Sequence, residues 1–175
     1  MKKRYYVTGI AGTGKSAVAK ELKKFNFDII DIDSVAGLCH WRHRETKREA
    51  KYMTGVGKEW LDAHEWICNE DMLKSLLDKD SEKNSVVVVG IAANQQDFFH
   101  LFDCVFLLHC SEGTLIKRLN TRDEGNNFGK DASEQKQILG WYKEFNKRLI
   151  ENGAIPVNTD QPLEKVVNEI RSRTH

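Results

Sequence analysis

A glycine-rich segment near the N-terminus constrains this chain more than any other part of its sequence. Gly9, Gly14, Lys15 and Ser16 have the spacing G-x-x-x-x-G-K-[ST] of a phosphate-binding loop. Glycines let successive backbone N–H groups turn inward around a phosphate, and the following helix adds partial positive charge from its N-terminus. In this motif the lysine reaches the terminal phosphates, and the serine hydroxyl can ligate Mg²⁺. The motif therefore predicts binding of a nucleoside triphosphate, but it does not say what happens to the γ-phosphate.

The sequence on both sides of the glycine loop has the context that the motif requires. A short β-type run from Arg4 to Thr8 precedes it, and the segment from Ser16 to Lys24 has apolar residues on one helical face. We expect the loop and the first turn of this helix to contact the nucleotide through Gly9, Ala11, Gly12, Thr13, Gly14, Lys15, Ser16 and Ala17.

Further β-type runs alternate with helical patterns along the rest of the chain. The run of valines within Ser85 to Gly90 does not alternate with polar residues, which predicts a strand buried on both faces of a parallel sheet. The other expected strands are Phe27 to Asp33, Cys104 to His109 and Ile155 to Asn158. The expected helices are Glu59 to Leu77, Asp97 to Phe102, Glu112 to Thr121 with Ser111 as N-cap, Ala132 to Glu151, and Leu163 to Arg173. This alternation predicts one three-layer α/β domain with a parallel sheet of about five strands, whereas residues 34–57 show no regular pattern.

Charge and composition exclude several broad classes. The chain has 27 Lys and Arg against 26 Asp and Glu, a net charge of +1, which argues against binding nucleic acid polymers through a basic face. No apolar stretch approaches the length of a membrane span, and Met-Lys-Lys-Arg is not followed by the apolar segment of a signal peptide. The four cysteines form no C-x-x-C pair and are expected to be reduced and mostly buried. We therefore expect a cytoplasmic protein without a membrane partner.

Two acids lie at the end of the second expected strand. Alternation along a strand would place Asp31 and Asp33 on the same face, at the carboxyl end where ligands of open α/β sheets bind. One carboxylate could hold Mg²⁺ through water and the other could accept a proton from an attacking hydroxyl. Asp31 is the expected metal residue and Asp33 the expected base, with a solvated turn as the alternative.

The valine strand ends without the acid that many phosphate-loop proteins carry at this point. The sequence Gly90-Ile-Ala-Ala-Asn-Gln95 offers no Walker-B aspartate, so either Asp31 takes the metal role or the protein does not hydrolyse in the usual way. Gly90, Asn94 and Gln95 are candidates to face an acceptor substrate, and a plain loop is the alternative.

Two groups of cationic residues are candidates for ligand contacts. Arg118 and Arg122 are four residues apart on one helical face, so one guanidinium could stack on a base while the other meets phosphate. Lys130 adds charge to the polar segment that follows. Arg42, within Arg-His-Arg, could meet an anionic acceptor, and Trp41 beside it is a candidate stacking contact. Solvent-exposed charge is the alternative for both groups.

Taken in order, these motifs resemble those of the small phosphate-loop kinases of the adenylate kinase and shikimate kinase group. Asp31-Ile-Asp33 is similar to the Asp-x-Asp of shikimate-kinase-like proteins. Arg118 and Arg122 are similar to the Arg-x-x-x-Arg that opens the lid in adenylate-kinase-like enzymes. The segment Val157 to Val167 resembles the one whose loop lines the adenine pocket. The resemblance covers most of the chain.

The resemblance implies a P-loop NTPase-type fold that uses ATP and Mg²⁺. It makes Lys15, Asp33 and Arg122 the catalytic candidates and places Gln161 and Pro162 at the adenine. It also implies a small lid at about residues 122–130 and an acceptor-binding region at about residues 34–66.

The identity of the phosphate acceptor stays open at this point. The arginines that hold a monophosphate in nucleotide kinases are not evident after residue 34, and the glycine triplet of shikimate kinases is absent at Gly90. The first candidate acceptor is a nucleoside or nucleoside monophosphate, and the next is another small hydroxylated metabolite. A nucleotide-binding regulatory protein and a slow ATPase are the alternatives to a kinase. We expect a monomer or homodimer.

Overall fold

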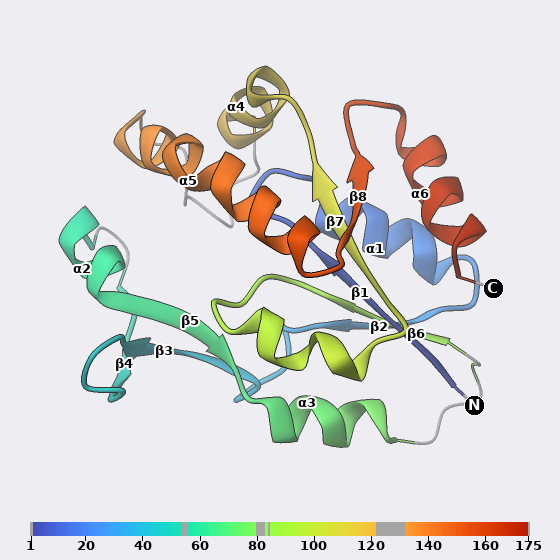
Figure 1. Cartoon of the computed structure of the whole chain (residues 1–175), viewed down its shortest axis with the longest axis horizontal. Coiled ribbons are helices and arrows are strands. Elements are labelled where there is room, and N and C mark those ends of the chain that lie inside the picture. Colours follow the sequence, from blue (N-terminus) through green and yellow to red (C-terminus); the bar gives the residue numbers. More distant parts are fainter. Residues whose placement is uncertain (1, 54–55, 80–82, 84, 122–131, 175) are drawn as a thin grey trace.

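The computed structural model describes residues 2–53, 56–79, 83, 85–121 and 132–174, with the side chains of 132–134 left out. A five-stranded parallel sheet forms the centre of the chain (Figure 1), in the order β2-β6-β1-β7-β8. This confirms the predicted α/β fold. The strands are β1 (Lys3–Thr8), β2 (Asp28–Asp31), β6 (Ser85–Val89), β7 (Cys104–His109) and β8 (Ile155–Asn158).

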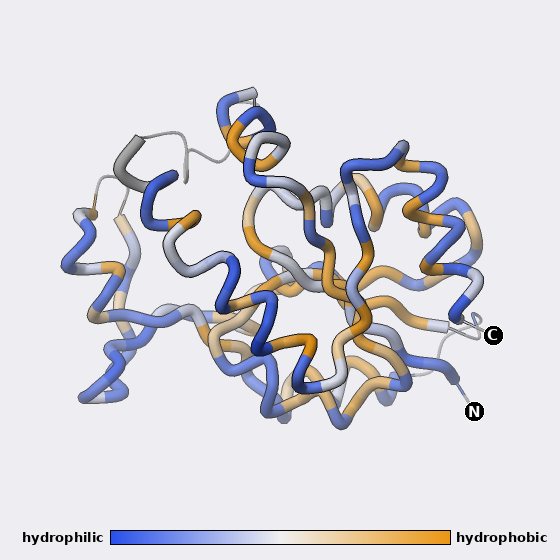
Figure 2. Tube along the Cα trace, turned by 45° about the horizontal axis from the view of Figure 1, so that its top comes forward, coloured by the Kyte–Doolittle hydropathy of each residue, from blue (hydrophilic) through white to orange (hydrophobic). Residues whose placement is uncertain are grey.

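Helices cover both faces of the main sheet, which explains why its inner strands are apolar without alternation. On one face, α1 (Lys15–Lys23) and α6 (Leu163–Ser172) pack against residues such as Val7 and Val87. On the other face, residues such as Tyr6 and Val88 pack against α3 (Glu70–Leu77), the 3₁₀ helix η1 (Gln95–Leu101) and α5 (Ala132–Glu151). The helix α4 (Glu112–Asn120) joins α5 in a third apolar cluster. Figure 2 shows the apolar residues concentrated where strands meet helices.

Most predicted elements are present with ends that differ by one or two residues. Ser111 caps α4 as predicted, because its side chain accepts a hydrogen bond from the amide of Thr114. The predicted second strand is shorter than expected and ends at Asp31, because residues 32–34 form a turn.

The helix predicted from Glu59 to Leu77 is wrong. This segment forms a short helix α2 (Lys58–Ala63), a strand β5 (His64–Cys68) and then α3. The helix α3 (Glu70–Leu77) is capped by Asn69, whose side chain accepts a hydrogen bond of 3.0 Å from the amide of Met72. The apolar residues of the segment are compatible with one helical face. Its central part nevertheless forms a strand, because β5 pairs with a distant strand.

That partner lies in the region that showed no regular pattern. β3 (Cys39–His43) pairs with β4 (Glu49–Ala50) and with β5 in a small antiparallel sheet of order β4-β3-β5. Trp41 and Trp66 are directly opposite each other in this sheet, with ring centroids 5.6 Å apart. The small sheet projects to one side of the main sheet, toward the far end of α5 (Figure 1).

Two further findings concern the cysteines and the length and apolar character of the helices. All four cysteines are free, with Cys68 and Cys110 buried and Cys39 and Cys104 half-buried. In the part of the chain that the structure describes, no helix combines the length and the apolar character needed to cross a membrane.

Candidate active site

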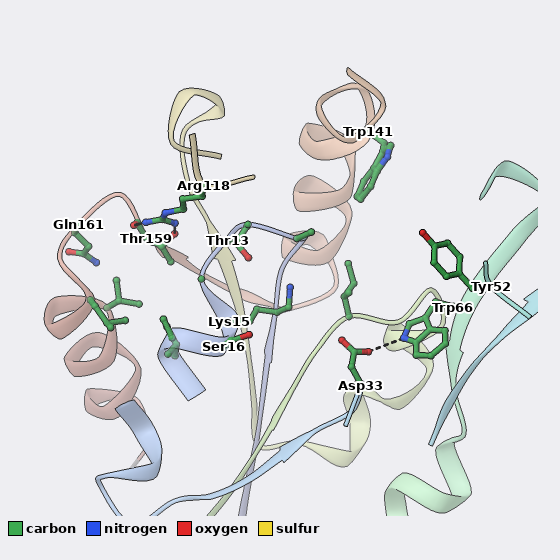
Figure 3. A pocket seen from close by; sticks show the side chains of 18 of the residues that line it. Thr13, Lys15, Ser16, Asp33, Tyr52, Trp66, Arg118, Trp141, Thr159 and Gln161 are labelled. Atoms are coloured by element: carbon green, nitrogen blue, oxygen red, sulfur yellow. Dashed lines mark hydrogen bonds between the residues drawn. The ribbon is translucent and has the colours of Figure 1, made fainter. Parts of the chain in front are cut away.

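A cavity of about 830 Å³ lies at the carboxyl end of the main sheet, centred on the glycine loop between β1 and α1. Figure 3 shows that its labelled side chains form two groups on either side of Lys15. Arg118, Thr159 and Gln161 lie on one side, which we call the nucleotide end. On the other side, which we call the acceptor end, lie Asp33, Tyr52, Trp66 and Trp141. Trp41 also lines the cavity, and its ring contacts those of Tyr52 and Trp66.

The glycine loop has the conformation of an anion-binding site. Gly12 and Gly14 have positive φ angles of 89° and 97°, and Gly14 precedes α1 without any described side chain capping that helix. The first amide groups of α1 therefore face the cavity, where a phosphate would satisfy them. Lys15 lies within the loop, and its Nζ donates to the carbonyls of Gly9 at 2.6 Å and Ile10 at 3.0 Å. These groups fit a triphosphate, and the exposed Ser16 lines the same cavity. Its hydroxyl is of the type that ligates Mg²⁺, and this role stays a prediction.

The nucleotide end is held together by Arg118. From α4, its guanidinium donates to the hydroxyl of Thr159 at 2.9 Å and to the carbonyl of Thr159 at 2.6 Å. These bonds fix the loop that follows β8. The predicted Gln161 lines this end, whereas Pro162 precedes α6 and is not among the lining residues. The apolar part of the wall, which sequence reasoning missed, consists of Val18, Leu163 and Val166.

At the acceptor end, Asp33 is the only acid among the described lining residues. Its Oδ1 accepts a hydrogen bond of 3.0 Å from Nε1 of Trp66, which comes from β5 of the small sheet. Partial desolvation raises the pKa of Asp33 above its ordinary value, and the nearby charge of Asp31 raises it further. The Trp66 hydrogen bond and the charge of Lys15 act in the opposite direction without cancelling this rise in pKa.

Asp31 and Asp33 do not share a strand face as predicted. β2 ends at Asp31, the following Ile32 is buried, and the amide of Asp33 donates to Oδ1 of Asp31 at 3.0 Å. Asp31 lines a separate hollow beside α1, and it is not among the residues that line the main cavity. The structure therefore gives its carboxylate a role in holding the turn that positions Asp33. A metal role for Asp31 stays a prediction.

The structure places Arg42 away from the cavity. Trp41 lines the cavity, and the next residue of β3 lies on the opposite face of the small sheet. There, Nε of Arg42 donates to Glu65 at 2.8 Å, and Arg44 and Lys47 contact the same carboxylate. The predicted contact of Arg42 with an acceptor is therefore replaced by an ion pair within the small sheet.

Asn94 and Gln95 are occupied by contacts inside the fold. The side chain of Asn94 accepts from the amide of Cys68 and donates to its carbonyl, both at 2.9 Å, which ties β5 to the loop after β6. Gln95 is buried, and its Oε1 accepts from the hydroxyls of Thr8 and Tyr6. Neither residue is among those that line the main cavity, so the predicted contact of Asn94 with substrate is corrected to a structural role.

Gly90 supports Asp33 indirectly instead of lining the cavity. Its φ angle is +151°, and a Cβ at this position would overlap the side chain of Ile32, the residue before Asp33. We expect Gly90→Ala to lower the free energy of unfolding by about 1–3 kcal/mol from overpacking alone. Gly140 in α5 has no atom within 4 Å of an added Cβ, so Gly140→Ala should instead raise stability by about 0.5–1 kcal/mol. Thermal unfolding of both variants checks this, and equal melting temperatures would contradict it.

Arg122, Lys130 and the predicted lid at residues 122–130 lie outside the described residues. The roles expected for them stay predictions.

Sequence reasoning missed most of the acceptor end. Tyr52 and Trp141 line it without having been singled out, and Trp66 was assigned to a helix. A weak signal was present, because Trp41 and Trp66 each lie beside a charged residue, Arg42 and Glu65, as expected for a strand with one polar face. Only pairing of the two strands brings these rings together.

The comparisons with known proteins agree with this fold. A family model described as an AAA domain matches residues 6–140. The structure resembles shikimate kinase from Bacteroides thetaiotaomicron with a TM-score of 0.62 and 19% identity, over 98% of this chain and 97% of that one. It also resembles deoxyadenosine kinase from M. mycoides, with a TM-score of 0.60 and 16% identity over 97% of each chain.

A third similar structure is shikimate kinase from Acinetobacter baumannii in complex with shikimate. The TM-score is 0.59 at 18% identity, over 99% of this chain and 95% of that one. A comparison with curated protein sequences gave no match. The predicted resemblance to small phosphate-loop kinases is thus confirmed at the level of the fold, and the chain belongs to the AAA-domain family.

Proposed function

We propose that the protein is an ATP-dependent small-molecule kinase that transfers the γ-phosphate to a hydroxyl or phosphate group of a nucleoside or nucleoside monophosphate. The observation that carries this proposal is that the glycine loop and Asp33 line one cavity. A triphosphate held by the loop and an acceptor beside Asp33 would thus meet near Lys15. The similar structures named as shikimate kinase and deoxyadenosine kinase support the same reaction class.

The proposed chemistry follows from these positions. The carboxylate of Asp33 accepts the proton of the acceptor hydroxyl, whose oxygen forms a bond to the γ-phosphorus while the bond from this phosphorus to the β–γ bridging oxygen breaks. The products are ADP and the phosphorylated acceptor. Lys15 and the amides at the start of α1 stabilise the negative charge on the phosphates. Mg²⁺ bound through Ser16 would neutralise further charge on the β- and γ-phosphates.

The nucleotide end suits an adenine base. Leu163 and Val166 offer an apolar wall, and Gln161 offers an amide group that can both donate and accept hydrogen bonds. Arg118 fixes the loop that carries this site through its bonds to Thr159. Its guanidinium also borders the cavity, where it can meet phosphate or stack on the base.

The test of this proposal is acceptor-dependent release of ADP. Purified protein with Mg·ATP is incubated with separate nucleosides, nucleoside monophosphates and hydroxylated metabolites, and the phosphorylated product is identified by ³¹P NMR. We expect at least one acceptor to accelerate ADP release and to gain a phosphate. A basal rate that no acceptor changes would support a slow ATPase. Tight ATP binding with negligible turnover would support a regulatory protein.

The raised pKa of Asp33 predicts the pH dependence of turnover. Because Asp33 acts as a base only when ionised, kcat/KM should rise with pH through a pKa above the ordinary aspartate value of 3.8. Trp66→Phe removes the hydrogen bond that lowers this pKa, so the acidic limb of the profile should move to higher pH. Trp60→Phe changes a ring that contacts Trp41 without lining the cavity, and it should leave the limb in place. An unchanged limb in Trp66→Phe would contradict the assignment.

A further inference from the structure

We propose that the aromatic side chains of the acceptor end bind the flat, uncharged base of a nucleoside, so that the acceptor is a nucleoside and not a nucleoside monophosphate or a carboxylic acid. This inference rests on the proposed kinase function and narrows its acceptor. We call the aromatic subsite the set formed by Trp41, Tyr52, Trp66 and Trp141, all of which line the cavity.

The rings of the aromatic subsite come from different elements of the fold. Trp41 and Trp66 come from paired strands of the small sheet, and Tyr52 follows β4. Trp141 comes from α5, and its ring points into the cavity (Figure 3). Tyr52 and Trp66 also lie at this end, beside Asp33. The subsite is therefore bordered by rings from two separate parts of the fold, an arrangement suited to stacking on a planar base.

Packing among the rings holds the aromatic subsite in shape. Trp41 stacks on Tyr52 with ring centroids 5.8 Å apart and an interplanar angle of 20°. Trp60, which is not among the lining residues, contacts Trp41 with ring centroids 5.1 Å apart and stacks on His64 at 4.0 Å. The hydrogen bond from Trp66 to Asp33 fixes a further ring. Because the rings are held by contacts with one another and with Asp33, little ordering of side chains is needed on binding.

The charges of the lining side chains disfavour an anionic acceptor. Among the described residues that line the cavity, the cations are Lys15, in the glycine loop, and Arg118, at the nucleotide end. Of the lining residues that the structure describes, Asp33 is the one that carries a charge at the acceptor end. A phosphate or carboxylate on the acceptor would thus enter an aromatic subsite beside a negative charge, which is unfavourable in a partly desolvated site.

Three cations of the small sheet and its turn do not add positive charge to the acceptor end. Arg42, Arg44 and Lys47 all pair with Glu65 on the face opposite Trp41 and Trp66, and the side chain of Glu65 is only 13% exposed. Burial alone would raise the pKa of Glu65, but the hydrogen bonds from Arg42 and Lys47 lower it overall, so it stays ionised and holds these cations. They are not placed to meet an anionic acceptor.

Asp33 lies between Trp66 of the aromatic subsite and Lys15 of the glycine loop (Figure 3). A nucleoside carries its hydroxymethyl group one sugar ring away from its base. With the base in the aromatic subsite, this hydroxyl can extend past Asp33 toward Lys15, where the γ-phosphate is expected. The cavity volume of about 830 Å³ lies in the upper part of the range typical of ligand sites.

The experiment measures binding and transfer separately on the full chain. Isothermal titration calorimetry, with Mg²⁺ and a non-hydrolysable ATP analogue present, compares adenosine, guanosine, cytidine and thymidine with their 5′-monophosphates, shikimate and choline. ADP release and ³¹P NMR with Mg·ATP measure transfer to the same compounds. We expect at least one nucleoside to bind and to be phosphorylated on its hydroxymethyl group, and to bind at least tenfold more tightly than its monophosphate.

Variants test whether the rings do the binding. Trp141→Ala and Tyr52→Ala remove the rings of residues that are each 37% exposed. Phe25→Ala removes the ring of a residue that is 43% exposed and does not line the cavity. We expect the first two to raise the nucleoside Kd about tenfold or more and Phe25→Ala to leave it unchanged. Thermal unfolding checks that all three are folded. An unchanged Kd in folded Trp141→Ala and Tyr52→Ala would overturn the inference.

The outcomes separate this inference from the proposed function. Transfer only to a monophosphate or to shikimate would leave the kinase function standing and overturn the inference. Preferred binding of choline would overturn it in favour of a cation held by the rings and Asp33. Nucleoside binding that depends on the rings but gives no transfer would overturn the kinase function alone. Neither binding nor transfer with any compound would overturn both.

Discussion

Lys15→Ala is expected to remove nearly all phosphoryl transfer from a protein that still folds. Loss of one preorganised donor at a developing charge typically costs about 10²–10³ in kcat, and weaker binding of Mg·ATP adds to the loss in kcat/KM. The structure adds a second contribution, since Nζ of Lys15 also holds the carbonyls of Gly9 and Ile10. Turnover with the acceptor found by the screen, together with nucleotide titration, measures both effects.

Two further variants make this test specific. Lys15→Met keeps most of the length of the side chain but removes its charge, so it should lose turnover to a similar extent. Lys20→Ala removes an exposed lysine of the same helix that lies outside the main cavity, and it should behave like the unchanged protein. Near-normal turnover by a folded Lys15→Ala protein would contradict the assignment.

Asp33→Asn is expected to lower kcat by about 10²–10⁴-fold, the contribution typical of a positioned general base, with little change in Mg·ATP binding. An asparagine keeps an oxygen that can accept the hydrogen bond from Trp66, so the geometry of the turn should survive. The acidic limb of the pH profile should also disappear. Single-turnover kinetics measure phosphoryl transfer, and nucleotide titration measures the binding of Mg·ATP. Equal, small losses in binding and turnover would remove Asp33 from the catalytic residues.

Two other aspartates serve as comparators for Asp33. Asp71 lies in the first turn of α3, away from the cavity, and Asp71→Asn should keep normal turnover. Asp31→Asn addresses the metal role that stays a prediction. A higher Mg²⁺ requirement would support that role. Lower stability with an unchanged Mg²⁺ requirement would support the role that its bond to the amide of Asp33 indicates.

The nucleotide half of the site was predictable because its signals are local. The glycine spacing, Lys15 and the strand and helix around them lie within about 20 consecutive residues, and the backbone conformation of this loop depends on those residues. The run of valines in β6 was equally informative, because a strand covered by helices on both faces has no polar side. Arg118 and Gln161 followed from the order of the motifs, and both line the cavity.

The acceptor half was not predictable in the same way. The segment 59–77 has apolar residues that fit a helix, and its central part becomes a strand only because Trp66 and its neighbours pair with β3, more than twenty residues earlier in the sequence. The same pairing directs Arg42 toward Glu65 and Trp41 toward the cavity, which no local pattern specifies.

The sequence by itself thus determined the α/β fold and the glycine loop, and it indicated that Asp33 lies near the carboxyl end of the second strand. The tertiary structure decided which side chains face the acceptor, because cross-strand pairing of the small sheet and the approach of Trp141 from α5 bring together rings that are far apart in the chain. Short segments with mixed apolar patterns have little preference between helix and strand, so their conformation is set by the partners against which they bury their surface.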